Sequence, residues 1–198
     1  DWQLVILVCS IIIIMIMGVR QSLGLFLEPI SNFMNNGKEF FSFAIGVQAI
    51  IWGIVTFFLG IAIDKFGPQK VLAFGIVSFS SGIFLMSNPT SDFKLFSATT
   101  LMGFGLGGAG MATMVSIAGK VAPINKRSLA MGLVAAAASF GQFAVVLPTM
   151  WLNKEFGWET SLIVLASVVI VLLIFLPLLK STNTKNSNAQ DFGNSLQQ

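Results

Sequence analysis

Long apolar runs, separated by short polar segments, are the dominant pattern of this sequence. A transmembrane helix needs about 20 mostly apolar residues, and six runs reach or approach that length. They cover residues 4–30, 41–63, 71–86, 95–118, 129–152 and 160–179. Within the runs the apolar residues are continuous and do not alternate with polar ones, which favours helices over the strands of a membrane barrel. The pattern predicts an all-α membrane protein whose six transmembrane helices form one bundle.

The segments between the runs are short and rich in Asn, Gly, Pro and charged residues, which is the composition of turns. Short connections predict helices that run alternately up and down. After residue 180 the sequence becomes polar and cannot bury enough apolar surface to fold. We therefore expect a six-helix bundle over residues 1–180 and a polar cytoplasmic linker or tail, expected to be disordered, over residues 181–198.

The composition agrees with a protein that faces lipid. Hydrophobic residues make up 55% of the chain and charged residues only 10%, whereas a soluble domain has about 25% charged residues. The net charge is +3, but the basic residues stand singly or in pairs and form no patch of the size that nucleic acid needs. The expected partner of the surface is the lipid bilayer, and nucleic acid is excluded.

The basic residues predict the orientation of the chain, because cytoplasmic loops carry an excess of Lys and Arg. One side of the predicted membrane has Lys65, Lys70, Lys120, Lys126, Arg127, Lys180 and Lys185, and the other has Lys38, Lys94 and Lys154. This asymmetry predicts that both ends are cytoplasmic. Trp2, Trp151 and Trp158 lie at the predicted interfaces, as anchoring aromatic residues do, whereas Trp52 lies mid-span and is interpreted as a packing residue.

Several kinds of chemistry are excluded by composition. The chain has no histidine and one cysteine, Cys9, so it lacks the usual zinc ligands and a Ser-His-Asp arrangement. Within the spans only Arg20 and Glu28 are ionisable apart from this thiol. We expect no catalytic residues, no metal and no cofactor, although a membrane-embedded enzyme remains the alternative hypothesis, together with a non-transporting membrane assembly protein.

The most specific motif is GIAIDKFGPQK, in the turn between the second and third runs. It contains Gly60, Asp64, Lys65, Gly67 and Lys70 at the spacing G-x-x-x-D-[RK]-x-G-x-[RK]-[RK], with Gln69 in place of one base. This loop resembles the signature of the Major Facilitator Superfamily. We expect Gly60 to allow close helix approach, Gly67 to permit a tight turn, and Asp64 to accept charge-assisted hydrogen bonds that latch one transport state. The alternative is a solvated turn with unrelated charges.

Further fragments extend the resemblance along the chain. They are GVRQSLGLFLEPI, FFSFAIG, KRSLAMGL and FGWETS, each at the edge of or within a predicted span. Together they are similar to the branch of the superfamily that contains monocarboxylate transporters and oxalate:formate antiporters. Thr99 stands where many members carry an arginine, so the resemblance does not extend to proton coupling.

The resemblance implies secondary active transport of small organic anions by alternating access, with six of twelve spans in this chain. The sequence begins with Asp1 and not with Met, so we expect a fragment of a twelve-span protein. Its partner would be the carboxy-terminal six-helix half of the same transporter, or a second copy of this chain. Substrate, coupling ion and direction of transport do not follow from the sequence.

Arg20 is the leading candidate for substrate contact. It lies about 16 residues into the first run, ~24 Å along a helix and so beyond the middle of a hydrocarbon core about 30 Å thick. A charge at this depth usually faces a cavity or a partner, and a guanidinium can bind a carboxylate through two parallel hydrogen bonds. Snorkelling toward the outer headgroups beside Gln21 is the alternative. Glu28 could pair with Arg20, but a solvated acid at the rim is the simpler expectation.

Other polar or small residues inside the runs complete the candidate site. Gln21, Gln48 and Gln142 are expected beside Arg20 as substrate-binding residues, with interhelical hydrogen bonding as the alternative, and Pro148 predicts a kink. The fourth run contains G-x-G-x-x-G, but it lacks the strand and acid of a dinucleotide site. Gly103 and Gly107 are instead interpreted as a pair of small residues for close helix packing.

Overall fold

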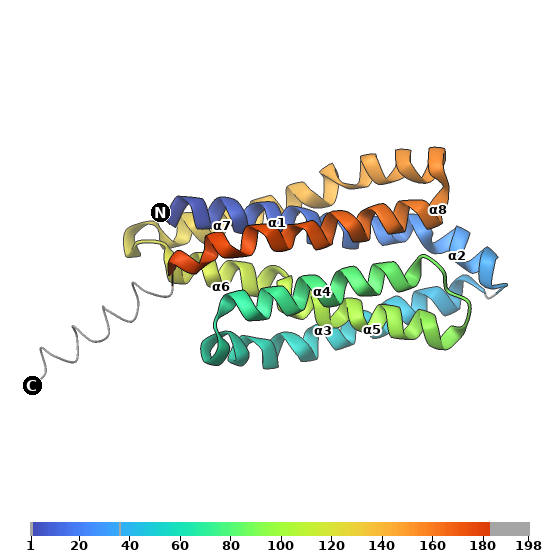
Figure 1. The fold of residues 1–198 in the computed structure, drawn as a ribbon, viewed down its shortest axis with the longest axis horizontal. Helices are drawn as coiled ribbons and strands as arrows, with labels where there is room; N and C mark the ends of the chain where they lie inside the picture. The colour runs from blue at the N-terminus through green and yellow to red at the C-terminus, as the bar shows by residue number, and fades with distance from the viewer. Residues whose placement is uncertain (1, 36, 183–198) are drawn as a thin grey trace, which may run out of the picture.

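The computed structural model describes residues 2–35 and 37–182, and every regular element in this part of the chain is a helix (Figure 1). The elements are α1 Trp2–Ser22, η1 Leu23–Phe26, α2 Leu27–Met34, α3 Lys38–Phe66, α4 Pro68–Met86, α5 Asp92–Ala109, α6 Met111–Val121, η2 Ile124–Lys126, α7 Arg127–Ala144, α8 Val146–Val171 and η3 Leu172–Thr182. The predicted tail covers residues 181–198; residues 181 and 182 are the last two of η3, and 183–198, with Lys185, lie outside the described residues.

Five helical segments of the described chain are long and apolar enough to cross a membrane. They are Trp2–Met34, Lys38–Phe66, Pro68–Met86, Asp92–Val121 and Ile124–Leu179. The all-helical prediction is confirmed, and the first four segments contain the first four predicted spans. The predicted fifth and sixth spans are not separate segments, because both fall within Ile124–Leu179.

This last segment includes the 3₁₀ turn η2 and part of η3, and its α8 contains one residue with non-helical backbone angles. Gly157 has φ 82° and ψ 165°, values outside the helical region, and Figure 1 shows the ribbon of α8 turning back on itself between its orange and red parts. Val145 separates α7 from α8, but its φ of −85° and ψ of −27° are helical values. Its amide donates a 3.1 Å hydrogen bond to the carbonyl of Gly141, as in a continuous helix. Pro148 has no amide hydrogen to donate to the carbonyl of Ala144, and the kink expected from Pro148 stays a prediction.

The predicted fourth span is interrupted at its centre, which the sequence pattern did not indicate. Gly110 separates α5 from α6 with φ −83° and ψ −170°. The hydroxyl of Thr113 donates a hydrogen bond of 3.2 Å to the carbonyl of Gly107 and thereby satisfies one acceptor released by the break. The first span is also irregular, because the 3₁₀ turn η1 lies between α1 and α2.

Small residues let the helices approach closely. α5 packs against both α3 and α4: a Cβ added at Gly103 would contact Ile51 of α3, and one added at Gly105 would contact Phe79 of α4. Gly107 faces Val55 of α3 in the same way. The interpretation of Gly103 and Gly107 as a close-packing pair is confirmed, because side chains at these positions would push α3 away.

Figure 1 shows the amino terminus, the turn between α3 and α4, the connection between α6 and α7 and the end of η3 at one end of the bundle. The arrangement agrees with helices that run alternately up and down. Trp2 lies at this end, with the Lys126 ammonium 5.6 Å from its ring centroid, whereas Trp158 packs against Phe33, 5.4 Å between centroids.

The helices α3 and α7 leave much apolar surface outside the bundle. Phe43, Ile50, Ile54, Phe57, Phe58 and Ile61 of α3 are exposed, as are Leu129, Leu133, Phe140 and Phe143 of α7. An apolar surface of this extent is stable against lipid or against another apolar protein surface and not in water.

Candidate functional site

Arg20 lies in the last turn of α1 and is half-buried. Its guanidinium carbon is 4.7 Å from the ring centroid of Trp52 on α3. Within residues 2–35 and 37–182 it forms neither an ion pair nor a side-chain hydrogen bond. Stacking on an aromatic face offsets part of the cost of a charge among apolar helices, but it leaves the N–H donors of the guanidinium without acceptors. An anion placed here would meet an unneutralised charge.

Gln48 lies on α3 one helical turn before Trp52 and is 2% exposed. Its side-chain nitrogen is buried and has no hydrogen-bond partner in the described part of the chain. Gln48, Arg20 and Ser42 line the same cavity of about 250 Å³ between α3 and the α1–α2 segment. Because buried polar atoms are normally satisfied, two sets of unpaired donors at one cavity indicate a place for an acceptor.

Glu28 does not neutralise Arg20. Its carboxylate is 3.6 Å from the ammonium of Lys38, and both side chains are largely exposed. Leu27 and Ser42, which neighbour this ion pair along the chain and along α3, line the cavity of Arg20. The structure therefore agrees with an acid at the rim of the site.

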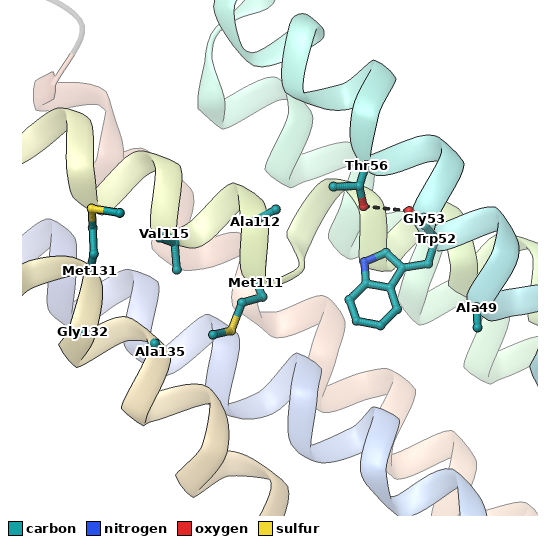
Figure 2. Close-up of a pocket in the computed structure, with 10 residues that line it drawn as sticks. All are labelled: Ala49, Trp52, Gly53, Thr56, Met111, Ala112, Val115, Met131, Gly132 and Ala135. Atoms are coloured by element: carbon teal, nitrogen blue, oxygen red, sulfur yellow. Dashed lines mark hydrogen bonds between the residues drawn. The ribbon is translucent and has the colours of Figure 1, made fainter. Parts of the chain in front are cut away.

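A larger cavity of about 800 Å³ lies among α3, α6 and α7 and is open on one side. Its lining residues are Ala49, Trp52, Gly53, Thr56, Met111, Ala112, Val115, Met131, Gly132 and Ala135. Figure 2 shows the indole of Trp52 extending from α3 into this space, with Met111 on α6 and Ala135 on α7 across from it. Trp52 thus lines the larger cavity, and its ring also stacks against Arg20, which lines the smaller one.

The remaining predicted substrate residues are not brought to these cavities. Gln21 is exposed, and Gln142 is half-buried on α7, but neither lines the cavity of Arg20 or the larger one. Trp52, interpreted as a packing residue, packs against the core, and its ring also lies beside Arg20 and borders the larger cavity. Its spacing from Gln48 and Thr56, four residues on either side, places the three on one helix face, and this was the signal in the sequence.

The signature turn has a defined geometry. Asp64, at the end of α3, forms an ion pair with Lys120 of α6, and both side chains are exposed. Gly67 has φ 86°, which agrees with its expected role in the turn, and the side-chain nitrogen of Gln69 donates a 3.0 Å hydrogen bond to the carbonyl of Leu176. Gly60 does not mediate close approach in this chain, because a Cβ there would meet no atom within 4 Å.

No group of three or more His, Cys, Asp or Glu side chains that could hold a metal ion occurs among the described residues. The cavity of Arg20 offers donors for an anion, and the larger cavity offers an apolar surface. Neither provides a nucleophile beside a base. Together with the apolar helices, these features define a helical membrane protein with two cavities between its helices.

Residues 7–198 match the Major Facilitator Superfamily, and the chain belongs to this family. It is therefore a multi-pass integral membrane protein from a family of transporters and not of enzymes.

Similar proteins are also transporters by name. An uncharacterized MFS-type transporter, YcxA, of Bacillus subtilis (strain 168) is 28% identical over 79% of this chain and 39% of its own length. The agnestins efflux protein AgnL12 of Paecilomyces divaricatus is 28% identical over 63% of this chain and 27% of its own. A probable 4-methylmuconolactone transporter of Cupriavidus pinatubonensis is 29% identical over 58% of this chain and 28% of its own. The chain thus spans less than half the length of these curated relatives.

Proposed function

We propose that this chain forms one six-span bundle of a secondary transporter that moves small organic anions by alternating access. The single observation that carries the proposal is the unpaired guanidinium of Arg20 beside the unpaired amide of Gln48 in one cavity. Both groups offer N–H donors, and a carboxylate offers two acceptor oxygens that fit a guanidinium fork. Resemblance to the monocarboxylate-transporter-like branch supports the same class of substrate.

The six spans follow from treating Gly157 as the turn between the fifth and the sixth. Gly157 departs from helical geometry within the polar sequence NKEFGWE, and charged residues in such a segment are favoured at the membrane surface and not in its core. The excess of bases at the end with the α3–α4 turn supports an orientation in which both ends of the bundle are cytoplasmic.

The open face of the bundle requires a second bundle in this proposal. In alternating access two bundles rock about a site between them. The larger cavity is lined by α3, α6 and α7, and α3 and α7 have much exposed apolar surface. A carboxy-terminal half of the same transporter, or a second copy of this chain, would cover this face. The ion pair of Asp64 with Lys120 would stabilise one of the two states.

Substitution of Arg20 tests the proposal directly. In the complete transporter, reconstituted in liposomes, Arg20→Gln should reduce uptake of organic anions by at least about a hundredfold, and Arg20→Lys should weaken it by about tenfold because the ammonium lacks the planar fork. Arg127→Gln, the same change at the other arginine of the chain, is the control and should transport normally. Full activity of Arg20→Gln would refute the role of this residue.

A further inference from the structure

The two cavities beside Trp52 differ in chemistry. The cavity of Arg20 and Gln48 has unpaired donors and a volume of about 250 Å³. The larger one has a volume of about 800 Å³ and no charged residue among its lining side chains. Cavities of roughly 300–1,000 Å³ with mainly apolar walls are typical of sites for drug-sized molecules. A small acid such as acetate would occupy only the first cavity.

Resting on the proposed function, we propose that the larger cavity receives the apolar body of the substrate, so that the transported anions are carboxylates with a ring-sized apolar group. The carboxylate binds Arg20 and Gln48, and the ring lies in the space among α3, α6 and α7. Trp52 lies beside both parts, because its ring stacks against the guanidinium of Arg20 and also borders the larger cavity.

The walls of the larger cavity suit a planar ring. Trp52 provides an aromatic surface, and Met111 and Met131 provide thioethers, which make favourable contacts with aromatic rings. The hydroxyl of Thr56 donates a 2.7 Å hydrogen bond to the carbonyl of Trp52 (Figure 2), so it is already satisfied by the chain itself. The wall is therefore mainly apolar, with the indole N–H of Trp52 as the other side-chain donor among the lining residues, and it suits an apolar ring.

The hollow exists because small residues line it on three helices. Larger side chains at the lining positions would fill the space, but three of these positions hold small residues, namely Gly53 of α3, Ala112 of α6 and Gly132 of α7. Gly110, where α5 and α6 separate, lies against Trp52: a Cβ there would be 3.3 Å from the indole nitrogen. The break in the fourth span thus gives the indole its place beside the cavity.

A lipid chain or a side chain of the second bundle could also fill an apolar cavity. Neither an acyl chain nor an apolar side chain would itself neutralise Arg20; that would also require an anionic lipid headgroup or an acid of the second bundle at this place. A carboxylate with an attached ring provides both the negative charge for Arg20 and the apolar volume for the cavity. Charge complementarity therefore favours an amphipathic anion as the occupant.

Filling the cavity tests the inference. A Cβ at Gly132 would meet no atom within 4 Å, and Gly132 lines the cavity, so the side chain of Gly132→Leu begins in open space and adds volume to the cavity. In proteoliposomes with the complete transporter, we expect Gly132→Leu to reduce [¹⁴C]benzoate uptake by about tenfold or more and [¹⁴C]acetate uptake by less than about twofold. Gly46→Leu is the matched control: Gly46 has the same open surroundings but lies outside the cavity lining.

Enlarging the cavity provides a second, opposite test. Met131 is 37% exposed, so Met131→Ala should not disturb the core, and it should raise the uptake of 2-naphthoate relative to benzoate. Equal loss of benzoate and acetate in Gly132→Leu would indicate contact with the second bundle, and no loss of either would indicate lipid. Both results would overturn the inference but leave the proposed function intact, provided that Arg20→Gln abolishes uptake. Absence of any carboxylate transport would refute the proposed function itself.

Discussion

At the scale of single residues, the site is defined by donors that the chain leaves unsatisfied. A buried polar group without a hydrogen bond costs about 1–3 kcal/mol, and Gln48 is 2% exposed with an unpartnered nitrogen. Arg20 lies at the same cavity without an ion pair in the described chain. We expect a protein to retain the free-energy cost of an unpaired polar side chain at a cavity where a bound ligand forms the missing hydrogen bond.

We therefore predict that Gln48→Met stabilises the protein and weakens substrate binding. Removing the unpaired amide should raise the free energy of unfolding by about 1 kcal/mol, measured as a higher melting temperature of the purified protein in detergent. The apparent KM for the transported anion should rise about tenfold, since one hydrogen bond to a charged group is lost.

Ser31→Ala is the control for this prediction. The hydroxyl of Ser31 is also buried without a partner, but it does not line the cavity of Arg20. Its removal should raise stability and leave KM unchanged. A lower melting temperature for Gln48→Met, with KM unchanged, would show that Gln48 has a structural role only.

At the scale of elements, the turn between α3 and α4 sets how the second and third spans meet. Gly67 ends α3 and precedes Pro68, and its φ of 86° is unfavourable for any residue with a side chain. Gln69 joins this turn to η3 through its hydrogen bond to Leu176. The residue that departs from the expected base of the signature thus connects two elements far apart in the sequence.

Two glycines of this motif should respond differently to alanine. Gly67→Ala should destabilise the protein by about 1–3 kcal/mol, because the backbone would be strained. Gly60→Ala, inside α3 and with open space around it, should be neutral or stabilising by up to about 1 kcal/mol. Thermal unfolding of the two variants in detergent measures the difference, and equal melting temperatures would mean that the turn relaxes without cost.

The ion pair of Asp64 and Lys120 joins the ends of α3 and α6. Because both side chains are exposed, its contribution to stability should be below about 1 kcal/mol, so Asp64→Asn should leave membrane insertion and the melting temperature nearly unchanged. Transport should fall sharply if this contact stabilises one state of the cycle.

A charge swap distinguishes the pair from other contacts of Asp64. If the ion pair alone is required, Asp64→Lys combined with Lys120→Asp should recover transport that each single change loses, as measured by uptake into proteoliposomes. Failure of the double variant would indicate that Asp64 acts on another part of the complete transporter. Normal transport by Asp64→Asn would make the loop a plain turn.

At the scale of the whole molecule, the bundle has two ends that differ in charge and in aromatic contacts, and its proposed topology can be tested by labelling. Cys9 is the one cysteine of the sequence and is fully buried, so cysteines introduced at the surface can be labelled with little background. Asn88 lies in the connection between α4 and α5, and Glu155 lies on α8 two residues before Gly157; both are exposed. Asn125 is exposed in η2, between α6 and α7. Figure 1 shows the α4–α5 connection and the turn within α8 at the end opposite the α6–α7 connection.

We predict that Asn88→Cys and Glu155→Cys react with a membrane-impermeant maleimide in intact cells. The excess of bases lies at the opposite end of the bundle and predicts that that end is cytoplasmic and this one external. Asn125→Cys should react only after the cells are opened. The parent protein, with Cys9 alone, gives the background. Protection of Glu155→Cys in intact cells would contradict the turn at Gly157 and with it the sixth span.

The sequence by itself determined the class of protein, because lipid imposes a simple rule. Long apolar runs must be helical where no water can satisfy the backbone, and polar turn residues mark where a run ends. The outer limits of the helices followed from this rule to within a few residues for the first four spans. The signature turn also indicated the family, because its glycines and charged residues have a defined spacing in a short loop.

Only the tertiary structure decided which side chains meet. The break at Gly110 and the 3₁₀ turn after Arg20 depend on contacts between helices that apolar runs do not encode, and they place Arg20 over Trp52. Gln48 and Gln142 look alike in sequence, yet only Gln48 faces the cavity of Arg20, because the rotation of each helix is set by its packing partners. Hydrophobicity selects the helices and their ends, whereas close packing selects the faces that form the site.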